Sequence, residues 1–174
     1  MSEIIKGLFL GNAADSESVG TYADVVVNCT NDLPFFGCST TQAQYRIPAE
    51  DNGDPRQQSV FQAHAPEVLD AVAERIASDR DSSRMRVLVH CAAGRQRSAA
   101  FVAALLLKLR VCSNVDDAVE FVKAKKPDAF FGGVNFKTYL DGCHCSSSSF
   151  MELPLLCVVH GSSNEDAVAR RSPR

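Results

Sequence analysis

The residues with the clearest chemical potential lie in one short segment, residues 90–98, which reads HCAAGRQRS. An apolar run at Val87–Val89 precedes it, and a long apolar segment follows it. A strand that leads through small residues into a helix turns successive backbone N–H groups inward, and the helix N-terminus adds its partial positive charge. The segment therefore predicts a loop that binds a phosphate or a similar anion.

Two side chains of this loop could add chemistry to anion binding. Arg97 can donate two parallel charged hydrogen bonds to a phosphate, a geometry that suits a guanidinium group. Cys91 stands at the start of the loop, where the same dipoles favour the thiolate over the thiol. A thiolate that faces a bound phosphate is an activated nucleophile. Because His, Gly and two Arg flank Cys91, an inert core cysteine is the weaker interpretation.

The neighbouring residues each have a structural alternative. We expect His90 to orient the loop through hydrogen bonds, and the alternative is a core histidine with satisfied partners. Ser98 could be merely an N-terminal residue of the following helix.

The pattern of apolar residues predicts the elements that must position this loop. Val25–Val27 and Val87–Val89 are typical of buried strands, and Tyr45–Ile47 of a weaker strand that Pro48 ends. The segment from Ile4 to Leu10 predicts a short hairpin. We expect an α/β fold with a mixed, partly parallel sheet flanked by helices.

Apolar spacing of three or four residues predicts the helices. One covers 61–76, where Pro66 suggests a kink or two helices, and a buried central helix covers 98–109. A further helix begins at Ser113, and a last one includes Phe136 and Leu140. The phosphate loop thus lies between strand 87–90 and helix 98–109.

Length and composition favour one domain and exclude several classes of protein. The chain has 174 residues, is 45% apolar, and carries a formal charge of −3, which does not favour nucleic acid or anionic lipid as a partner. Its longest apolar run, Ala99–Leu107, is far shorter than the ~20 residues of a membrane-spanning helix. The seven cysteines lack the spacing of a disulfide framework, so we expect reduced thiols and a cytoplasmic protein.

A serine run at 146–149 marks a candidate boundary. We expect a catalytic domain at 1–145 and a C-terminal tail at 146–174 that could dock on it as an edge strand or bind a partner. The triplet at 143–145, Cys-His-Cys, is too tight to chelate one Zn²⁺ alone, so we expect no metal site.

The sequence HCAAGRQRS has the His-Cys-x5-Arg-Ser signature of the cysteine-dependent protein tyrosine phosphatase superfamily. The surrounding residues resemble its dual-specificity branch, in particular the small atypical type. Residues 4–12 are similar to the branch's opening hairpin, 45–51 to the strand and loop that carry its general acid, and 118–127 to its penultimate helix. The resemblance covers residues 3 to about 141. Because the hairpin begins at Ile4, we expect no kinase-docking domain before it.

The resemblance implies roles for particular residues. It implies Cys91 as the nucleophile, Asp51 as the general acid, and Ser98 as the group that helps the thiolate leave. It assigns substrate binding to the loop residues Ala92, Ala93, Gly94, Arg95, Gln96 and Arg97, and it implies no cofactor. Glu50 and Asp54 are local competitors for the acid, although the turn at 52–55 gives Asp54 a structural reason to exist.

Two residues depart from the branch's usual pattern. Gln96 stands where Ser is usual, and its amide could bond to the loop backbone or to water. Arg95 stands at a position where the branch commonly has an uncharged residue, whereas related phosphoinositide phosphatases carry Lys there. Arg95 could therefore bind a second phosphate, or it could be an exposed residue of the rim without a special role. Ala92 weakens the lipid interpretation, since those enzymes often carry a second Lys there.

The sequence thus predicts a phosphate monoester hydrolase that forms a cysteinyl-phosphate intermediate. A dual-specificity protein phosphatase is favoured, with phosphotyrosine or phosphoserine/threonine proteins as substrates. A phosphoinositide or RNA 5′-triphosphate phosphatase is the alternative, and a non-catalytic phosphate-binding module is another.

Overall fold

The computed structural model describes residues 1–36, 41–52, 54–79 and 85–144. The expected C-terminal tail and Cys145 lie outside these residues. Five strands form one sheet in the order β1-β2-β5-β3-β4. These strands are β1 (Ser2–Ile5), β2 (Leu8–Gly11), β3 (Val25–Asn28), β4 (Ala43–Arg46) and β5 (Val87–His90). β1 and β2 form the antiparallel hairpin that the sequence predicts, and every other pair of neighbours is parallel.

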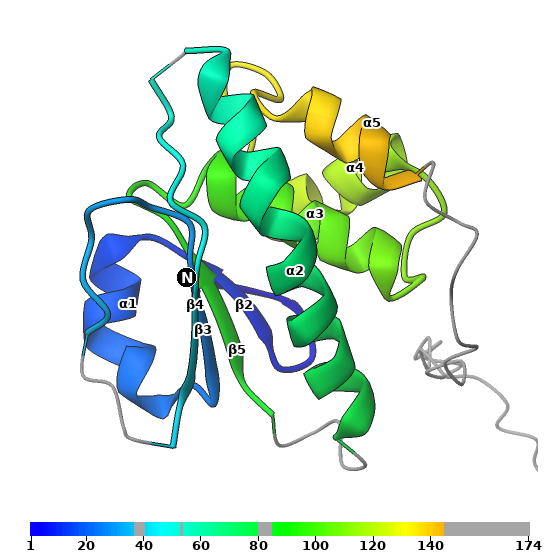
Figure 1. Ribbon diagram of the computed structural model, residues 1–174. Helices are drawn as coiled ribbons and strands as arrows, with labels where there is room; N and C mark the ends of the chain where they lie inside the picture. Colours follow the sequence, from blue (N-terminus) through cyan, green and yellow to red (C-terminus); the bar gives the residue numbers. More distant parts are fainter. Residues whose placement is uncertain (37–40, 53, 80–84, 145–174) are drawn as a thin grey trace, which may run out of the picture.

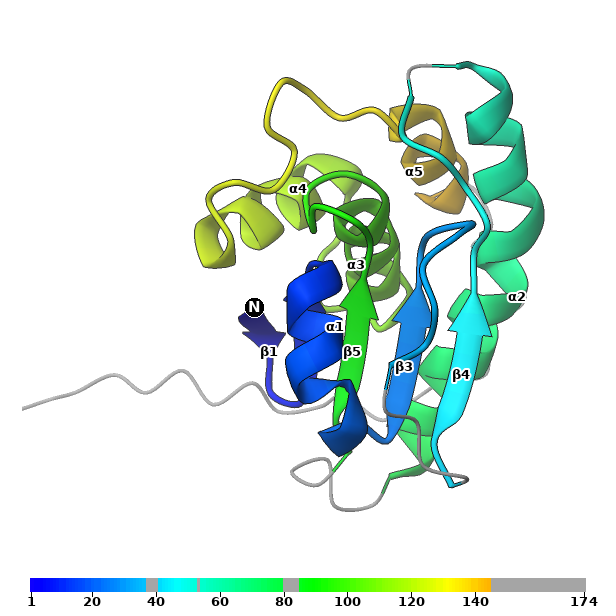
Figure 2. The ribbon, with the colours of Figure 1, turned by 90° about the vertical axis from the view of Figure 1, so that its left-hand side faces the viewer.

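The helices cover both faces of this sheet (Figures 1 and 2). On one face lie α1 (Ala13–Val19) and a 3-10 turn (Gly20–Tyr22). On the other face lie α2 (Arg56–Ser78), α3 (Arg97–Lys108), α4 (Val115–Lys125) and α5 (Lys137–His144). The predicted fold class, a mixed and partly parallel sheet flanked by helices, is confirmed.

The centre of the sheet brings the chemistry-bearing loop to one edge. Every residue of β3 and β5 is buried, as their continuous valine-rich runs predict for strands covered on both faces. Asn28 at the end of β3 pairs with His90 at the end of β5. The loop that begins at Cys91 therefore leaves the sheet at the carboxyl edge of the parallel strands, where ligands bind in open α/β sheets.

The central helix α3 begins one residue earlier than the sequence predicts, at Arg97, and ten of its twelve residues are buried.

Pro66 does not divide its segment into two helices, one of the two alternatives that the sequence predicts, because α2 is a single helix. Buried residues on both sides of Pro66, among them Phe61, Val68 and Val72, hold the helix to the core. The free energy gained by this burial offsets the loss of the backbone hydrogen bond that Pro66 cannot donate.

Two helix starts differ from the sequence prediction. α4 is capped by Asn114 and not by Ser113, since the Asn114 side chain accepts a hydrogen bond from the backbone N–H of Asp117. α1 was not predicted because Ser16 is its single buried residue, which leaves no apolar stripe. Asn12 and Asp15 nevertheless form a reciprocal capping box at its start. Across the described ranges, the structure contains no helix long and apolar enough to cross a membrane.

Candidate active site

The loop after β5 has a conformation that requires glycine at one position. Gly94 has a φ of 70°, in the left-handed region that favours glycine. A Cβ atom at this position would lie 2.7 Å from the carbonyl oxygen of Gly11 at the end of β2. The N–H of Gly94 donates to Cys91 Sγ at 3.2 Å. Gly94 thus lets the loop fold back over the cysteine.

Two hydrogen bonds converge on the sulfur of Cys91. Besides Gly94, the Ser98 hydroxyl donates to Sγ at 3.1 Å. Cys91 is 2% exposed and Ser98 is fully buried, so both bonds are shielded from water. Hydrogen bonds to a sulfur stabilise negative charge on it. The structure therefore brings together Cys91 and Ser98 in an arrangement that suits a thiolate.

Arg97 joins the loop to the segment that carries the candidate acid. It is buried, and its Nη1 donates to the carbonyl oxygen of Ala49 at 2.8 Å. Its Nε is also buried and has no hydrogen-bond partner among the described residues. Because a guanidinium group has five donors in a fixed fork, the remaining donors suit an oxyanion in the loop.

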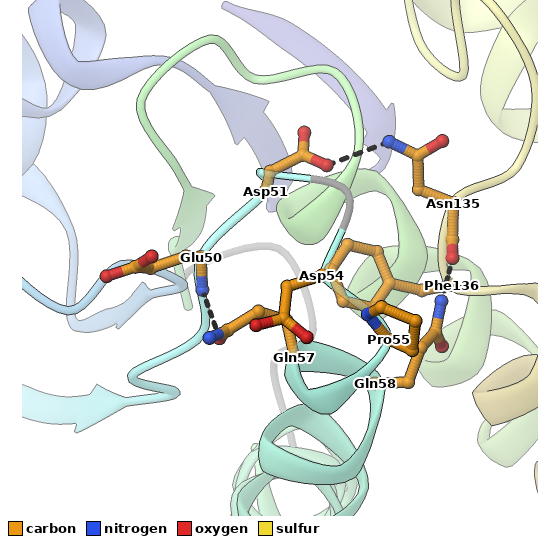
Figure 3. Close-up of a pocket in the computed structure, with 8 residues that line it drawn as sticks. All are labelled: Glu50, Asp51, Asp54, Pro55, Gln57, Gln58, Asn135 and Phe136. Carbon is orange, nitrogen blue, oxygen red and sulfur yellow. Dashed lines mark hydrogen bonds between the residues drawn. The ribbon is translucent and has the colours of Figure 1, made fainter.

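Asp51 and Asp54 lie in different surroundings (Figure 3). Asp51 is exposed, and its Oδ1 accepts a hydrogen bond from Asn135 Nδ2 at 2.8 Å. Asp54 instead forms an ion pair with Arg56, 2.7 Å from Nη2, and accepts from the Arg56 backbone N–H. The side-chain hydrogen bond from Arg56 lowers the pKa of Asp54. Asp54 is thus held as a carboxylate at the start of α2, a structural role in agreement with the predicted turn.

The segment of Glu50 and Asp51 is called the acid segment. A cavity of about 300 Å³ lies between the acid segment, the first turn of α2 and the chain around Asn135. Asp51, Glu50 and Asn135 are among its lining residues. The backbone N–H of Glu50 donates to Gln57 Oε1 at 2.8 Å. This bond anchors the acid segment to α2.

The ring of His90 connects the end of β5 to α1. It is fully buried, and its Nε2 lies 3.2 Å from the hydroxyl of Ser16 in α1. Burial lowers the pKa of His90 to about 4. The ring is therefore neutral near pH 7, and it ties the start of the loop to the helix on the opposite face of the sheet.

This depressed pKa predicts a pH dependence of stability. The unfolded chain protonates His90 below its ordinary pKa near 6.5, whereas the folded chain does so only near pH 4. As the pH drops from 6.5 to about 4, the titration of His90 should thus lower the free energy of unfolding by about 3 kcal/mol. Urea unfolding of the wild type and of His90→Gln at several pH values measures the difference. An identical pH dependence in both proteins would contradict the prediction.

Arg95 points to the surface and already has an anionic partner. Its side chain is 52% exposed, and Nε lies 3.4 Å from Asp128 Oδ2. Its guanidinium carbon lies 5.9 Å from the ring centre of Phe131, which is 76% exposed. Lys126 Nζ binds the other oxygen of the same carboxylate at 2.6 Å. Asp128 therefore offsets part of the positive charge that Arg95 adds to the rim.

The side chain of Gln96 bonds to a distant segment of the chain and not to the backbone of the phosphate loop. Its Nε2 donates to the carbonyl oxygens of Phe131 and Gly133, at 3.0 Å and 2.8 Å. Its Oε1 accepts from the backbone N–H of Asn135 at 3.1 Å. The expected bond to the loop backbone is thus replaced by a clamp on residues 131–135. Ala92 and Ala93, the remaining loop residues, are exposed at the mouth.

The sequence did not single out three residues that the structure places around the site, which are Ser16, Cys29 and Asn135. Cys29 is fully buried, and its backbone N–H donates to the carbonyl oxygen of His90. Burial, with a further contribution from Cys91, raises the pKa of Cys29 well above its ordinary value. Cys29 is therefore a neutral thiol beside the candidate nucleophile.

In the described part of the chain, no cluster of three His, Cys, Asp or Glu side chains could hold a metal ion.

Comparison with known proteins agrees with this geometry. The family model "Dual specificity phosphatase, catalytic domain" matches residues 8–141. The Drosophila melanogaster dual specificity protein phosphatase Mpk3 is 36% identical over 132 residues, which cover 72% of this chain and 30% of the relative. Human dual specificity protein phosphatase 4 is 37% identical over 134 residues, which cover 71% of this chain and 30% of the relative.

The structure of human DUSP28 has a TM-score of 0.65 at 23% identity, and the alignment covers 83% of this chain and 95% of that one. This likeness shows the shared fold. The chain spans about 30% of the length of each of these two curated relatives. From the family match over residues 8–141, together with these relatives, the chain belongs to the dual specificity phosphatase family.

Proposed function

We propose that residues 1–145 form a catalytic domain that hydrolyses phosphate monoesters of proteins through a cysteinyl-phosphate intermediate. The observation that carries the proposal is the sulfur of Cys91, which receives hydrogen bonds from Gly94 and Ser98 in a loop that also contains the buried Arg97. The family match supports a protein phosphatase.

In the first step, Cys91 Sγ attacks phosphorus and the bond from phosphorus to the substrate oxygen breaks. Arg97 and the backbone N–H groups of residues 92–97 hold the negative charge of the equatorial oxygens. Asp51 gives its proton to the leaving oxygen, so that an alcohol or phenol departs in place of its anion.

In the second step, water attacks the phosphorus of the cysteinyl phosphate. Asp51, now a carboxylate, accepts a proton from that water, and the sulfur leaves as a thiolate. Ser98 donates its hydrogen bond to the departing sulfur, which supports its proposed role in this step. The residues named here supply each proton and charge, so we propose a reaction without a metal ion or an organic cofactor.

Phosphotyrosine and phosphoserine/threonine proteins are the proposed substrates and partners. A reactive thiolate requires a reducing compartment, and the described cysteines Cys29, Cys91, Cys112 and Cys143 are free thiols. These observations support a cytoplasmic location. Turnover of phosphotyrosine and phosphothreonine peptides by the purified chain tests the proposal, and failure to hydrolyse either peptide or a simple aryl phosphate would contradict it.

Arg95 gives a prediction about substrate charge. Because Asp128 already pairs with Arg95, we expect Arg95→Ala to lower kcat/KM by the same small factor, below about fivefold, on singly and doubly phosphorylated peptides. Steady-state kinetics on a matched pair of peptides measures both values. A loss of roughly ten- to a hundredfold confined to the doubly phosphorylated peptide would show instead that Arg95 binds a second phosphate.

A further inference from the structure

We propose that Gln96 is a positioning residue for the general acid, and that it acts through Asn135. This inference rests on the proposed role of Asp51. Gln96 belongs to the phosphate loop by sequence, yet all three of its side-chain hydrogen bonds go to residues 131–135. It therefore joins the part of the site that holds phosphate to the part that holds the acid.

The carboxylate of Asp51 depends on Asn135 for its orientation. Asp51 is exposed, so packing does not restrict its rotamer. The hydrogen bond from Asn135 Nδ2 is the one that its side chain makes among the described residues, and it engages Oδ1. Oδ2 is then left to exchange a proton with the substrate. A displacement of Asn135 would release this constraint.

Asn135 is in turn held by three neighbouring groups. Gln96 Oε1 accepts from its backbone N–H, and Gln58 Nε2 donates to its backbone carbonyl (Figure 3). The next residue, Phe136, packs against Phe61 of α2 with ring centres 4.7 Å apart. Two of these anchors connect Asn135 to α2, and Gln96 alone among the three connects it to the phosphate loop.

The conformation of the clamped segment shows why a long amide is needed. Gly132 and Gly133 have φ values of 84° and 120°, and the described segment 131–135 lies between α4 and α5 without helical hydrogen bonds of its own. The carbonyl groups of Phe131 and Gly133 have no helical partner, so their donors come from another part of the chain. Gln96 is 5% exposed and supplies them with one NH₂ group. A serine side chain is too short to span the same three contacts.

The leaving-group dependence of hydrolysis separates acid positioning from general damage to the loop. 4-Nitrophenol leaves readily without a proton, whereas phenol does not. A misplaced acid should thus lower kcat/KM on phenyl phosphate by roughly ten- to a hundredfold, and on 4-nitrophenyl phosphate by about threefold or less. Damage to the phosphate loop would lower both values equally and weaken inhibition by orthovanadate.

The test uses Gln96→Met, which keeps the length of the side chain and removes its amide, and Asn135→Ala, which removes the contact with Asp51. The matched control is Gln42→Met, because Gln42 also donates an amide hydrogen bond to a backbone carbonyl, that of Ala23, at the opposite edge of the sheet. We expect both site variants to lose activity selectively on phenyl phosphate, with orthovanadate inhibition unchanged, and the control to retain the wild-type ratio.

A double variant completes the experiment. In the Asp51→Asn background, Gln96→Met should cause no further leaving-group-dependent loss, because the group that it positions is gone. The inference is overturned if Gln96→Met lowers both substrates equally, or lowers neither, while Asp51→Asn alone is selective. If Asp51→Asn is itself unselective, the assignment of the acid fails, and the inference fails with it.

Discussion

Cys91→Ser is expected to lower hydrolysis of every phosphate monoester by about 10⁴-fold or more while the protein still binds oxyanions. A serine hydroxyl is not ionised near neutral pH, so the loop loses its nucleophile. The donors that hold phosphate belong to the loop backbone and to Arg97, and the substitution leaves them in place. Single-turnover and steady-state rates on 4-nitrophenyl phosphate measure the loss.

The binding of tungstate or a phosphotyrosine peptide to the Cys91→Ser protein is the necessary control. Retained binding shows that the loop is intact and that chemistry alone has been lost. Cys29→Ser is a matched cysteine variant, since Cys29 is a buried neutral thiol that the proposed reaction does not use. Residual hydrolysis by Cys91→Ser within about tenfold of the wild type, or ~1.4 kcal/mol in the barrier, would place the nucleophile elsewhere.

Asp51→Asn should produce the second large effect, and it should depend on the leaving group. We expect kcat/KM to fall by about 10²–10⁴-fold for phenyl phosphate and phosphotyrosine peptides, whose oxygens need a proton to leave. The loss on 4-nitrophenyl phosphate should be much smaller. A series of aryl phosphates with phenols of increasing pKa measures this dependence as a slope.

Asp54→Asn is the matched control for the acid, three residues further along the chain. Arg56 holds the Asp54 carboxylate, so we expect this variant to change stability and to leave the slope of the leaving-group series unaltered. If Asp54→Asn steepens the slope and Asp51→Asn does not, then the acid is Asp54.

The sequence was sufficient for the features that local pattern determines. β3 and β5 are short runs of valine and leucine, and α3 is apolar on nearly all sides, so each could be predicted from its own residues. The loop between β5 and α3 could be predicted for the same reason, because its small residues and its arginine are contiguous. Cys91, Arg97 and Ser98 lie within eight consecutive residues of the chain.

The support around the acid could not be predicted in this way. Asp51 and Asn135 are 84 residues apart along the chain, and Gln96 and Asn135 are 39 apart. No local period relates such positions, because tertiary packing of α2 against α5 determines their contact. The 131–135 segment also has no apolar period to place it. A capping pair at Asn12 and Asp15 could have revealed α1, and with it the partner of His90, but α1 lacks the apolar stripe that identifies a helix.

The most direct test of the account is to trap the phosphoryl group on the protein. The Asp51→Asn protein, mixed with 4-nitrophenyl phosphate and quenched in acid, should accumulate the intermediate, since this substrate phosphorylates it without a proton while hydrolysis lacks its base. Intact-mass and peptide mass spectrometry should then find one phosphoryl group, bound to the sulfur of Cys91, and none in the Cys91→Ser protein. A phosphoryl group on another residue, or turnover without any phosphorylated protein, would contradict a cysteinyl-phosphate mechanism.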